Sequence, residues 1–200
     1  TLREVLDDIR FLGGCAFAAH PTSPRGETRF TRAEEPGNFG LEIVNGDTAW
    51  REASPFSLAL AAWTYPANPS FALRGTLGQF SSERALWDQM LQRRFVPALA
   101  GTDAHGRIPI SRTRSLPLPS YEALFSLART VVYLKQMPSS PIERRAAIVQ
   151  ALCAGRSAAA IPSIADPRGF SFAAESGNAV VAGPGDTVAA TAAVRLRAGG

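Results

Sequence analysis

The chain has 200 residues and 46% of them are hydrophobic, which is enough to bury one globular core. Its net charge is +4, but the arginines are scattered and are not clustered with aromatic residues, so we expect no nucleic-acid partner. No uninterrupted apolar run reaches the roughly 18 residues that a membrane-spanning helix needs, so we expect no membrane span either.

The first elements are a helix and a strand. Apolar residues repeat every three or four positions over residues 1–12, which predicts an amphipathic helix capped by Thr1 and ended by two glycines. A short apolar run over residues 15–20 then predicts a strand, which Pro21 closes. Because the sequence opens with a helix that leads into a strand, as in the middle of a βα series, we interpret it as an excerpt from a longer protein.

A long polar loop and a second strand follow. The loop at residues 21–40 is long for a passive connection, and its Arg25 is a candidate contact for an anionic substrate. Residues 41–47 predict a strand that ends in an Asn-Gly turn signal. Asp47 is placed to cap the helical stretch after this turn, which Pro55 bends or breaks.

The middle of the chain contains a loop, a helix and a third strand. Residues 63–79 hold several prolines and glycines, so we expect little regular structure there. Leu, Trp and Met at i,i+4 spacing predict a helix over residues 82–94. Residues 95–100 predict a buried strand, which ends abruptly in Gly-Thr-Asp-Ala-His-Gly.

The last α/β elements are two helices around a strand. Ser120 is expected to cap a short helix, and β-branched residues predict a strand over residues 130–135. Residues 140–143 read Ser-Pro-Ile-Glu, a capping box that opens a helix running to about residue 154.

The composition changes near the C-terminus. Alternating apolar and polar residues at 170–173 and 188–196 predict antiparallel strands. We therefore divide the chain into an α/β part at residues 1–161 and a β-rich appendage, or the start of a second domain, at residues 162–200.

The two cysteines are Cys15, in an apolar strand, and Cys153, in an apolar helix. Two thiols in a chain of this length do not make a disulfide scaffold. We expect both to be small residues of the core.

Side chains that bind metals follow two of the predicted strands. His20 ends the first, whereas Asp103 and His105 follow the third and share one direction in an extended backbone. Enzymes with parallel sheets place their chemistry at the carboxyl ends of strands, and a carboxylate with imidazoles suits a divalent metal. The alternative is that these are ordinary loop residues beside a glycine turn.

Three motifs in order carry a resemblance to a known family. His20 and its neighbours at 19–21, the strand and turn at 41–46, and Ala-Gly-Thr-Asp-Ala-His at 100–105 resemble the later motifs of the PHP superfamily, the polymerase and histidinol phosphatase group of metal-dependent phosphoesterases. A Gly-Arg-Ser turn at 155–157 before a β-rich tail is most similar to its carbaryl-hydrolase-like branch.

The resemblance implies that this α/β chain is the C-terminal part of a distorted (βα)₇ barrel. It implies two or three divalent ions (Zn, Mn or Fe), with His20, Asp103 and His105 as ligands and Glu42 close to them. The substrate would be a small-molecule phosphoester or related ester, hydrolysed by a metal-activated water. The candidate contacts for a substrate anion are Arg25 and Arg107.

The chain departs from the family in its ligand set. Members open with a His-x-His motif and carry further His and acidic ligands, which this sequence lacks. Either it begins after the first half of the barrel, or it is a non-catalytic PHP-like remnant or ligand-binding module. A third alternative is a different α/β hydrolase, although neither a Gly-x-Ser-x-Gly elbow nor a phosphate-binding Gly-x-x-x-x-Gly-Lys loop occurs. The sequence predicts neither the oligomeric state nor the compartment.

Overall fold

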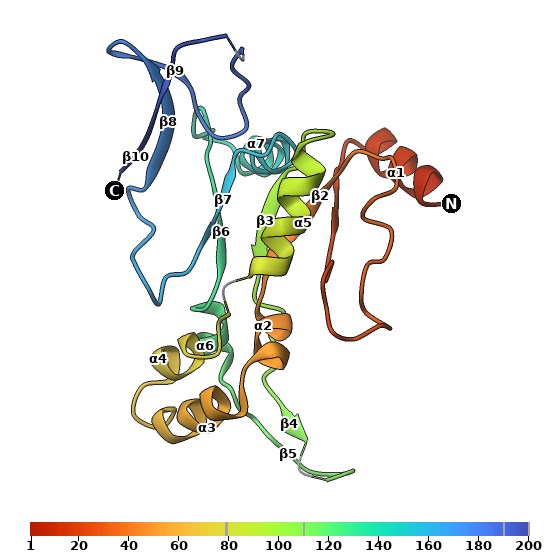
Figure 1. Cartoon of the computed structure of the whole chain (residues 1–200), viewed down its shortest axis with the longest axis vertical. Coiled ribbons are helices and arrows are strands. Elements are labelled where there is room, and N and C mark those ends of the chain that lie inside the picture. Colours follow the sequence, from red (N-terminus) through yellow and green to blue (C-terminus); the bar gives the residue numbers. More distant parts are fainter. Residues whose placement is uncertain (79, 110, 190, 200) are drawn as a thin grey trace.

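A parallel sheet forms the centre of the computed structural model, which describes residues 1–78, 80–109, 111–189 and 191–199 (Figure 1). Strand β2 lies between the other two. The strands are β1 (Ala16–Ala18), β2 (Phe39–Asn45) and β3 (Ala98–Gly101). All three were predicted, with bounds that differ by a few residues. Because they run parallel, their carboxyl ends meet at one end of the sheet.

Two predicted helices pack on this sheet. The first is α1 (Leu2–Phe11), where the Thr1 hydroxyl accepts from the Glu4 amide and the Glu4 carboxylate accepts in return from the Thr1 amine. The second is α5 (Ser81–Leu91), which contacts β2. One apolar core joins both helices to the sheet. Its largest buried members are Leu6, Phe39, Leu41, Met90 and Val96.

Prolines begin two helices where the sequence analysis expected a break and a loop. The helices that follow the second strand are α2 (Gly46–Glu52), α3 (Pro55–Thr64) and α4 (Pro69–Arg74). Pro55 follows the capping residue Ser54, and Pro69 follows the capping residue Asn68. At the first helical position proline loses no hydrogen bond. The expectation of little regular structure over residues 63–79 is therefore wrong.

An antiparallel strand pair forms a sheet of its own beside β3. Its strands are β6 (Arg129–Val132) and β7 (Ser157–Ala160). The Thr130 hydroxyl donates to the Ala100 carbonyl and accepts from the Ala100 amide, both at 2.9 Å, and the Ser157 hydroxyl donates to the Ala98 carbonyl. Side chains thus make bonds here that a backbone ladder would otherwise make. The first of these strands confirms the prediction at residues 130–135.

The remaining elements of this part are helical or short. Ser120 caps α6 and Ser140 caps α7, as the sequence predicts. The bounds are α6 (Tyr121–Phe125), α7 (Pro141–Cys153), and a small hairpin of β4 (Ile108–Pro109) and β5 (Ser115–Leu116).

A disulfide bond joins Cys15 to Cys153, so the expectation of two small core residues is wrong. Cys15 precedes β1 and Cys153 ends α7, 138 positions later in the sequence. The fold brings the end of this helix to the amino end of the sheet, and nothing in the sequence spacing indicates that return. The bond therefore ties the α7 helix to the first strand.

The C-terminal tail forms a separate antiparallel sheet, as predicted. Its order is β10-β8-β9, with bounds Arg195–Gly199, Ser171–Ser176 and Ala179–Ala182. Position 190 of the strand predicted over residues 188–196 lies outside the described residues; over the rest of that range the prediction is wrong up to residue 194, because β10 begins only at Arg195. Its pairing with β8 includes an ion pair of 3.3 Å between the Arg197 guanidinium and the Glu175 carboxylate, so charged groups contribute where the sequence pattern suggested apolar alternation.

The fold is mixed α/β, with one parallel sheet and small antiparallel sheets. Within the described ranges these strands do not close into a barrel, so the barrel implied by the resemblance is not confirmed. Among the helices in the described part of the chain, none is both long and apolar enough to cross a membrane.

Candidate metal centre

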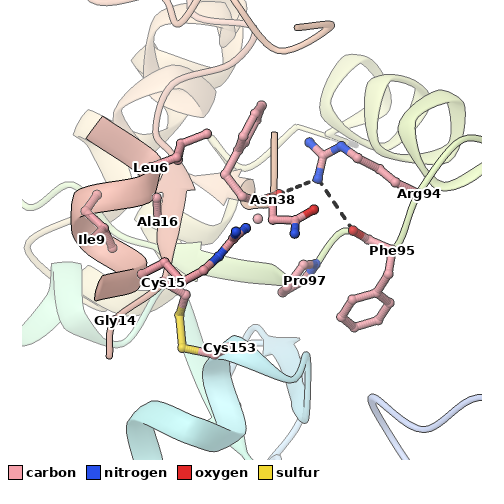
Figure 2. Close-up of a pocket in the computed structure, with 13 residues that line it drawn as sticks. Leu6, Ile9, Gly14, Cys15, Ala16, Asn38, Arg94, Phe95, Pro97 and Cys153 are labelled. Carbon is pink, nitrogen blue, oxygen red and sulfur yellow. Dashed lines mark hydrogen bonds between the residues drawn. A yellow bond between two sulfur atoms is a disulfide. The ribbon is translucent and has the colours of Figure 1, made fainter. Parts of the chain in front are cut away.

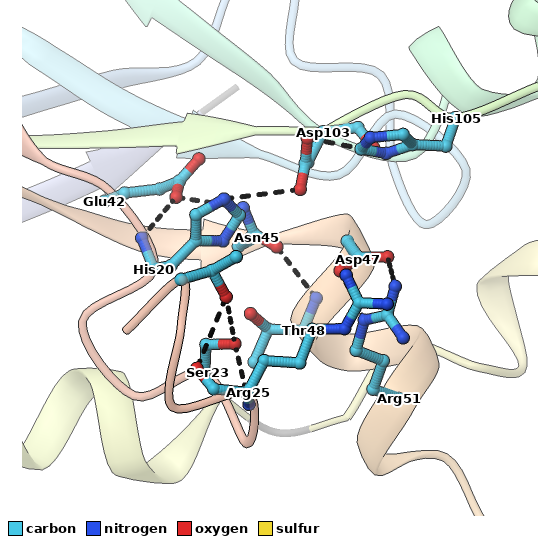
Figure 3. Close-up of polar contacts among 11 residues, drawn as sticks. His20, Ser23, Arg25, Glu42, Asn45, Asp47, Thr48, Arg51, Asp103 and His105 are labelled. Carbon is cyan, nitrogen blue, oxygen red and sulfur yellow. Dashed lines mark hydrogen bonds and ion pairs between the residues drawn. The ribbon is translucent and has the colours of Figure 1, made fainter. Parts of the chain in front are cut away.

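The carboxyl ends of the three parallel strands lead to polar side chains that gather in one place (Figure 3). The chain leaves β1 toward His20, leaves β2 toward Asp47, and leaves β3 toward Asp103 and His105. Parallel strands bring such residues together although they are far apart in sequence. The structure places His20 beside Asp103 and groups Asp103 and His105 with a further aspartate, Asp47, whereas His20 is not a member of that group among the described residues.

Asp103 lies between the two histidines. Its Oδ2 is 3.4 Å from Nε2 of His20, and its Oδ1 is 3.5 Å from Nδ1 of His105. Two ligands bound to one zinc ion at about 2.0–2.1 Å in tetrahedral geometry are about 3.4 Å apart. The separation between His20 and Asp103 therefore fits two ligands of one ion better than a direct hydrogen bond, which prefers shorter distances.

The imidazoles differ in surroundings. His105 is largely exposed, with Nδ1 2.7 Å from the Asp103 carbonyl oxygen. Because a carbonyl only accepts, we infer that this nitrogen carries the proton and that Nε2 keeps its lone pair. His20 is mostly covered, and its Nδ1 is buried without a hydrogen-bond partner in the described ranges. The imidazole nitrogens left for an ion are therefore Nε2 of His20, which faces Asp103, and Nε2 of His105, whereas Nδ1 of His20 is covered by protein.

Asp47 completes a group that the sequence analysis did not assemble. Ligand atoms of Asp47, Asp103 and His105 all lie within 4.8 Å of one another. Asp47 was expected to cap the helix that follows β2, but Asn45 caps α2 instead. Its side-chain oxygen accepts a hydrogen bond from the Thr48 amide at 2.8 Å. The sequence did contain a signal that Asp47 is a candidate ligand, because Asp47 follows the end of a predicted strand as the other candidate ligands do.

A basic side chain balances this aspartate. Arg51, one helical turn further along α2, donates to both carboxylate oxygens of Asp47, at 2.5 and 2.9 Å. Asp47 would thus share its charge between Arg51 and an ion. The donors present suit one divalent ion, whereas a cluster of two or three would need more ligands than the described residues supply here.

Backbone strain is concentrated at the same place. Three non-glycine residues in the described ranges have a positive φ, and two of them are His20 (51°) and Asp103 (46°). A left-handed conformation costs an ordinary residue about 1–2 kcal/mol. Such strain persists where the surrounding structure imposes it, and it is typical of functional sites.

Glu42 lies beneath the site, as the resemblance implied. Its carboxylate is buried and accepts from the His20 amide at 3.1 Å and from the Asn45 side chain at 2.9 Å. Burial raises the pKa of Glu42, with a smaller contribution from the charge of Asp103, and the two hydrogen bonds oppose this effect. Glu42 thereby fixes the backbone of one predicted ligand and the residue that caps α2.

Two glycines give the strands room to approach. A Cβ on Gly101 would collide with the Glu42 carboxylate, and a Cβ on Gly46 would collide with the Thr102 carbonyl. Glycine is required at both positions for space, because neither has a positive φ. These contacts hold the ends of β2 and β3 close to each other.

A cavity of about 270 Å³ opens beside the site. Asp47, Asp103 and His105 line it together with Arg107, one of the two predicted anion contacts. The other predicted contact, Arg25, does not line this cavity. It lies in the loop between β1 and β2, where its Nε is 3.9 Å from the Glu27 carboxylate. The apolar part of the wall consists of Trp50, Leu73, Pro119, Leu124 and Leu127.

Comparison with protein-family models, with curated proteins and with solved structures found no match to this chain.

Proposed function

We propose that this protein is a metal-dependent hydrolase of phosphoesters or related esters. The observation that carries the proposal is the group of Asp47, Asp103 and His105 in a cavity at the carboxyl ends of parallel strands; His20 lies next to Asp103 but does not line this cavity. The PHP-type barrel belongs to the same proposal, as does the assignment of His20, Asp103 and His105 as ligands.

The residues have distinct roles in this proposal. Asp103 and the Nε2 atoms of the two imidazoles would hold a Zn, Mn or Fe ion, and Asp47 would contribute one oxygen while Arg51 neutralises the rest of its charge. A divalent ion supplies positive charge that acidifies water and stabilises the anionic transition state of ester hydrolysis. Arg107 would bind the anionic part of the substrate, and the apolar wall of the cavity would exclude water from it.

One observation favours the alternative, a ligand-binding module without catalysis. Arg51 engages both oxygens of Asp47, so the carboxylate is already paired without an ion. If Asp47 serves only to hold the Arg51 side chain in this ion pair, then the cavity binds an anion through Arg51 and Arg107 and holds no metal.

The test is metal binding followed by hydrolysis. The protein is stripped with EDTA and dialysed against Zn, Mn or Fe(II), and bound metal is counted by plasma mass spectrometry. We expect about one equivalent, and we expect Asp103→Asn to weaken binding at least about tenfold, because loss of even an outer partner of a metal site costs about 10–100-fold. The metal-loaded protein is then assayed with bis(p-nitrophenyl) phosphate and p-nitrophenyl acetate.

The matched control is Asp88→Asn, which removes the same charge from an exposed position on α5. It should bind metal as the unmodified protein does. Failure of the unmodified protein to retain any of the three metals would refute the hydrolase and leave the binding module. Metal retention without hydrolysis of either ester would contradict the proposed reaction while preserving the metal site.

A further inference from the structure

A second cavity lies at the opposite end of the parallel sheet. It has a volume of about 330 Å³ and is bounded by the end of α1, the amino ends of the three strands and the end of α7 (Figure 2). Its charged and amide side chains are those of Arg10, Asn38 and Arg94, and among the described residues that line it none is acidic. The disulfide between Cys15 and Cys153 forms part of its wall.

Arg94 is held firmly at this cavity. Its Nη1 donates to the Phe39 carbonyl at 2.7 Å, and the guanidinium lies over the Phe39 ring, 4.4 Å from the centroid. Its Nη2 is buried and has no hydrogen-bond partner among the described residues. Burial lowers the pKa of Arg94, although an arginine keeps its charge at any physiological pH. A buried donor left without a partner is destabilising, because it has lost its hydrogen bonds to water.

Arg10 adds a second positive charge. It lies in the last turn of α1, and its ionic contact with Asp7 is long, at 3.9 Å, and exposed to solvent. Such a contact contributes little. Arg10 and Asn38 are exposed side chains that can adjust to a ligand, whereas Arg94 is fixed. The cavity thus combines one fixed and one mobile guanidinium, with no carboxylate on its described wall to neutralise them.

We propose that this cavity binds the phosphate or carboxylate group of a small metabolite through Arg10 and Arg94, with Asn38 as a further donor. The planar guanidinium fork matches both kinds of oxyanion. A bound oxyanion would accept from Arg10 and Asn38 and would be attracted by the fixed charge of Arg94, whose Nη2 is covered by protein atoms. The disulfide keeps the α7 wall in place, so the site is formed before the ligand arrives. This inference does not depend on the proposed hydrolase activity.

The experiment is isothermal titration calorimetry of the oxidised protein at low ionic strength with EDTA present. Inorganic phosphate and citrate are titrated separately, so that the two oxyanion chemistries are compared. We expect saturable binding of at least one of them, and the tighter one identifies the class of group. Arg10→Gln should raise its Kd by about tenfold, which corresponds to about 1.4 kcal/mol.

Arg3→Gln is the matched control. Arg3 lies on the same helix, contacts the same Asp7 at 3.8 Å, and does not line the cavity. It removes the same charge, so it should change the Kd by less than about twofold if binding is local. Equal losses in Arg3→Gln and Arg10→Gln would overturn the proposal, because they would show attraction by net charge alone.

Amide NMR shifts locate the anion. Binding in the proposed cavity should move the resonances of residues 38–40, whereas binding at the candidate metal centre would move those of residues 102–105. Shifts confined to the second group, or no saturation by either anion, would overturn the proposal. His105→Ala should leave the binding unchanged, which separates this site from the proposed hydrolase.

Discussion

The two ends of the parallel sheet are built from different side chains and are held in different ways. The carboxyl end carries Asp47, Asp103 and two histidines, with strained backbone at two of these residues. The amino end carries Arg10 and Arg94, and a covalent bond closes it. One end therefore gathers groups suited to a cation, and the other gathers cations without acidic partners on the cavity wall.

The difference shows how stability and chemistry are divided along the same strands. Left-handed residues at the carboxyl end cost free energy, which the rest of the fold must supply. The disulfide at the amino end can offset this cost, because it restricts the conformations of the unfolded chain and so stabilises the folded state relative to it. Variants at the amino end should therefore change the free energy of unfolding with little effect on metal affinity. Variants at the carboxyl end should change both.

The largest expected effect is loss of the disulfide. The paired variant Cys15→Ser with Cys153→Ser should lower the free energy of unfolding by about 2–4 kcal/mol, because the bond closes a loop with a sequence separation of 138. Urea unfolding measures this change. Zinc affinity measured on the folded variant should stay within about twofold of the unmodified protein. A tenfold loss of affinity would show that the two ends are coupled, contrary to the comparison.

The next effect is expected at the carboxyl end. In Gly46→Ala the new Cβ meets the Thr102 carbonyl, and a backbone atom cannot turn aside. Overpacking of this kind costs about 1–3 kcal/mol. It should also weaken metal binding, because β2 must move away from β3 and so separate Asp47 from Asp103. Thermal unfolding and zinc titration measure the two consequences.

Gly26→Ala serves as the control for this substitution. Nothing lies within 4 Å of a Cβ at Gly26, and its φ is not positive. Its stability should stay within about 0.5 kcal/mol of the unmodified protein. If Gly46→Ala were equally harmless, then the close approach of the two strands would not be what positions Asp47.

Sequence patterns were sufficient for elements whose signals are local. Helix α1 and helix α7 were predicted from caps and apolar spacing, and the parallel strands from short apolar runs before polar turns. The break at Pro55 within the helical stretch after Asp47 was predicted, since α2 ends at Glu52 and α3 begins at Pro55, whereas the helix that begins at Pro69 was missed because proline was interpreted only as a breaker. A capping Ser or Asn directly before each proline was the signal that distinguishes a helix start from a break.

Features that depend on distant parts of the chain could not be predicted in this way. The pairing of Cys15 with Cys153 requires the path of α7 across the sheet, which no local pattern contains. Placing Asp47 beside Asp103 requires the order of the strands, because β2 lies between β1 and β3. Predicting that His20 lies near Asp103 succeeded for a simpler reason, since both follow strands that run in the same direction.

The smallest expected effect concerns Glu42 and is a dependence on pH. Burial raises its folded-state pKa above the ordinary 4.5, so the folded state holds more protons than the unfolded state between these two values. Stability from this group therefore falls as the pH rises through that window, whereas Glu42→Gln has no such loss. Measured with EDTA, the unmodified protein should lose stability relative to Glu42→Gln as the pH rises from the ordinary glutamate pKa through the raised folded-state pKa.

The exposed Glu34→Gln variant removes the same charge and should show no such trend. If the unmodified protein instead gained stability relative to Glu42→Gln as the pH rises, the hydrogen bonds from the His20 amide and the Asn45 side chain would outweigh burial in setting the pKa of Glu42. Glu42 would then be a fully ionised anchor for the His20 backbone, and its charge would add to the attraction of this end of the sheet for a cation. Either result decides whether burial or hydrogen bonding has the larger influence on the ionisation of the carboxylate beneath the candidate ligands, a question that does not arise at the disulfide-bonded amino end.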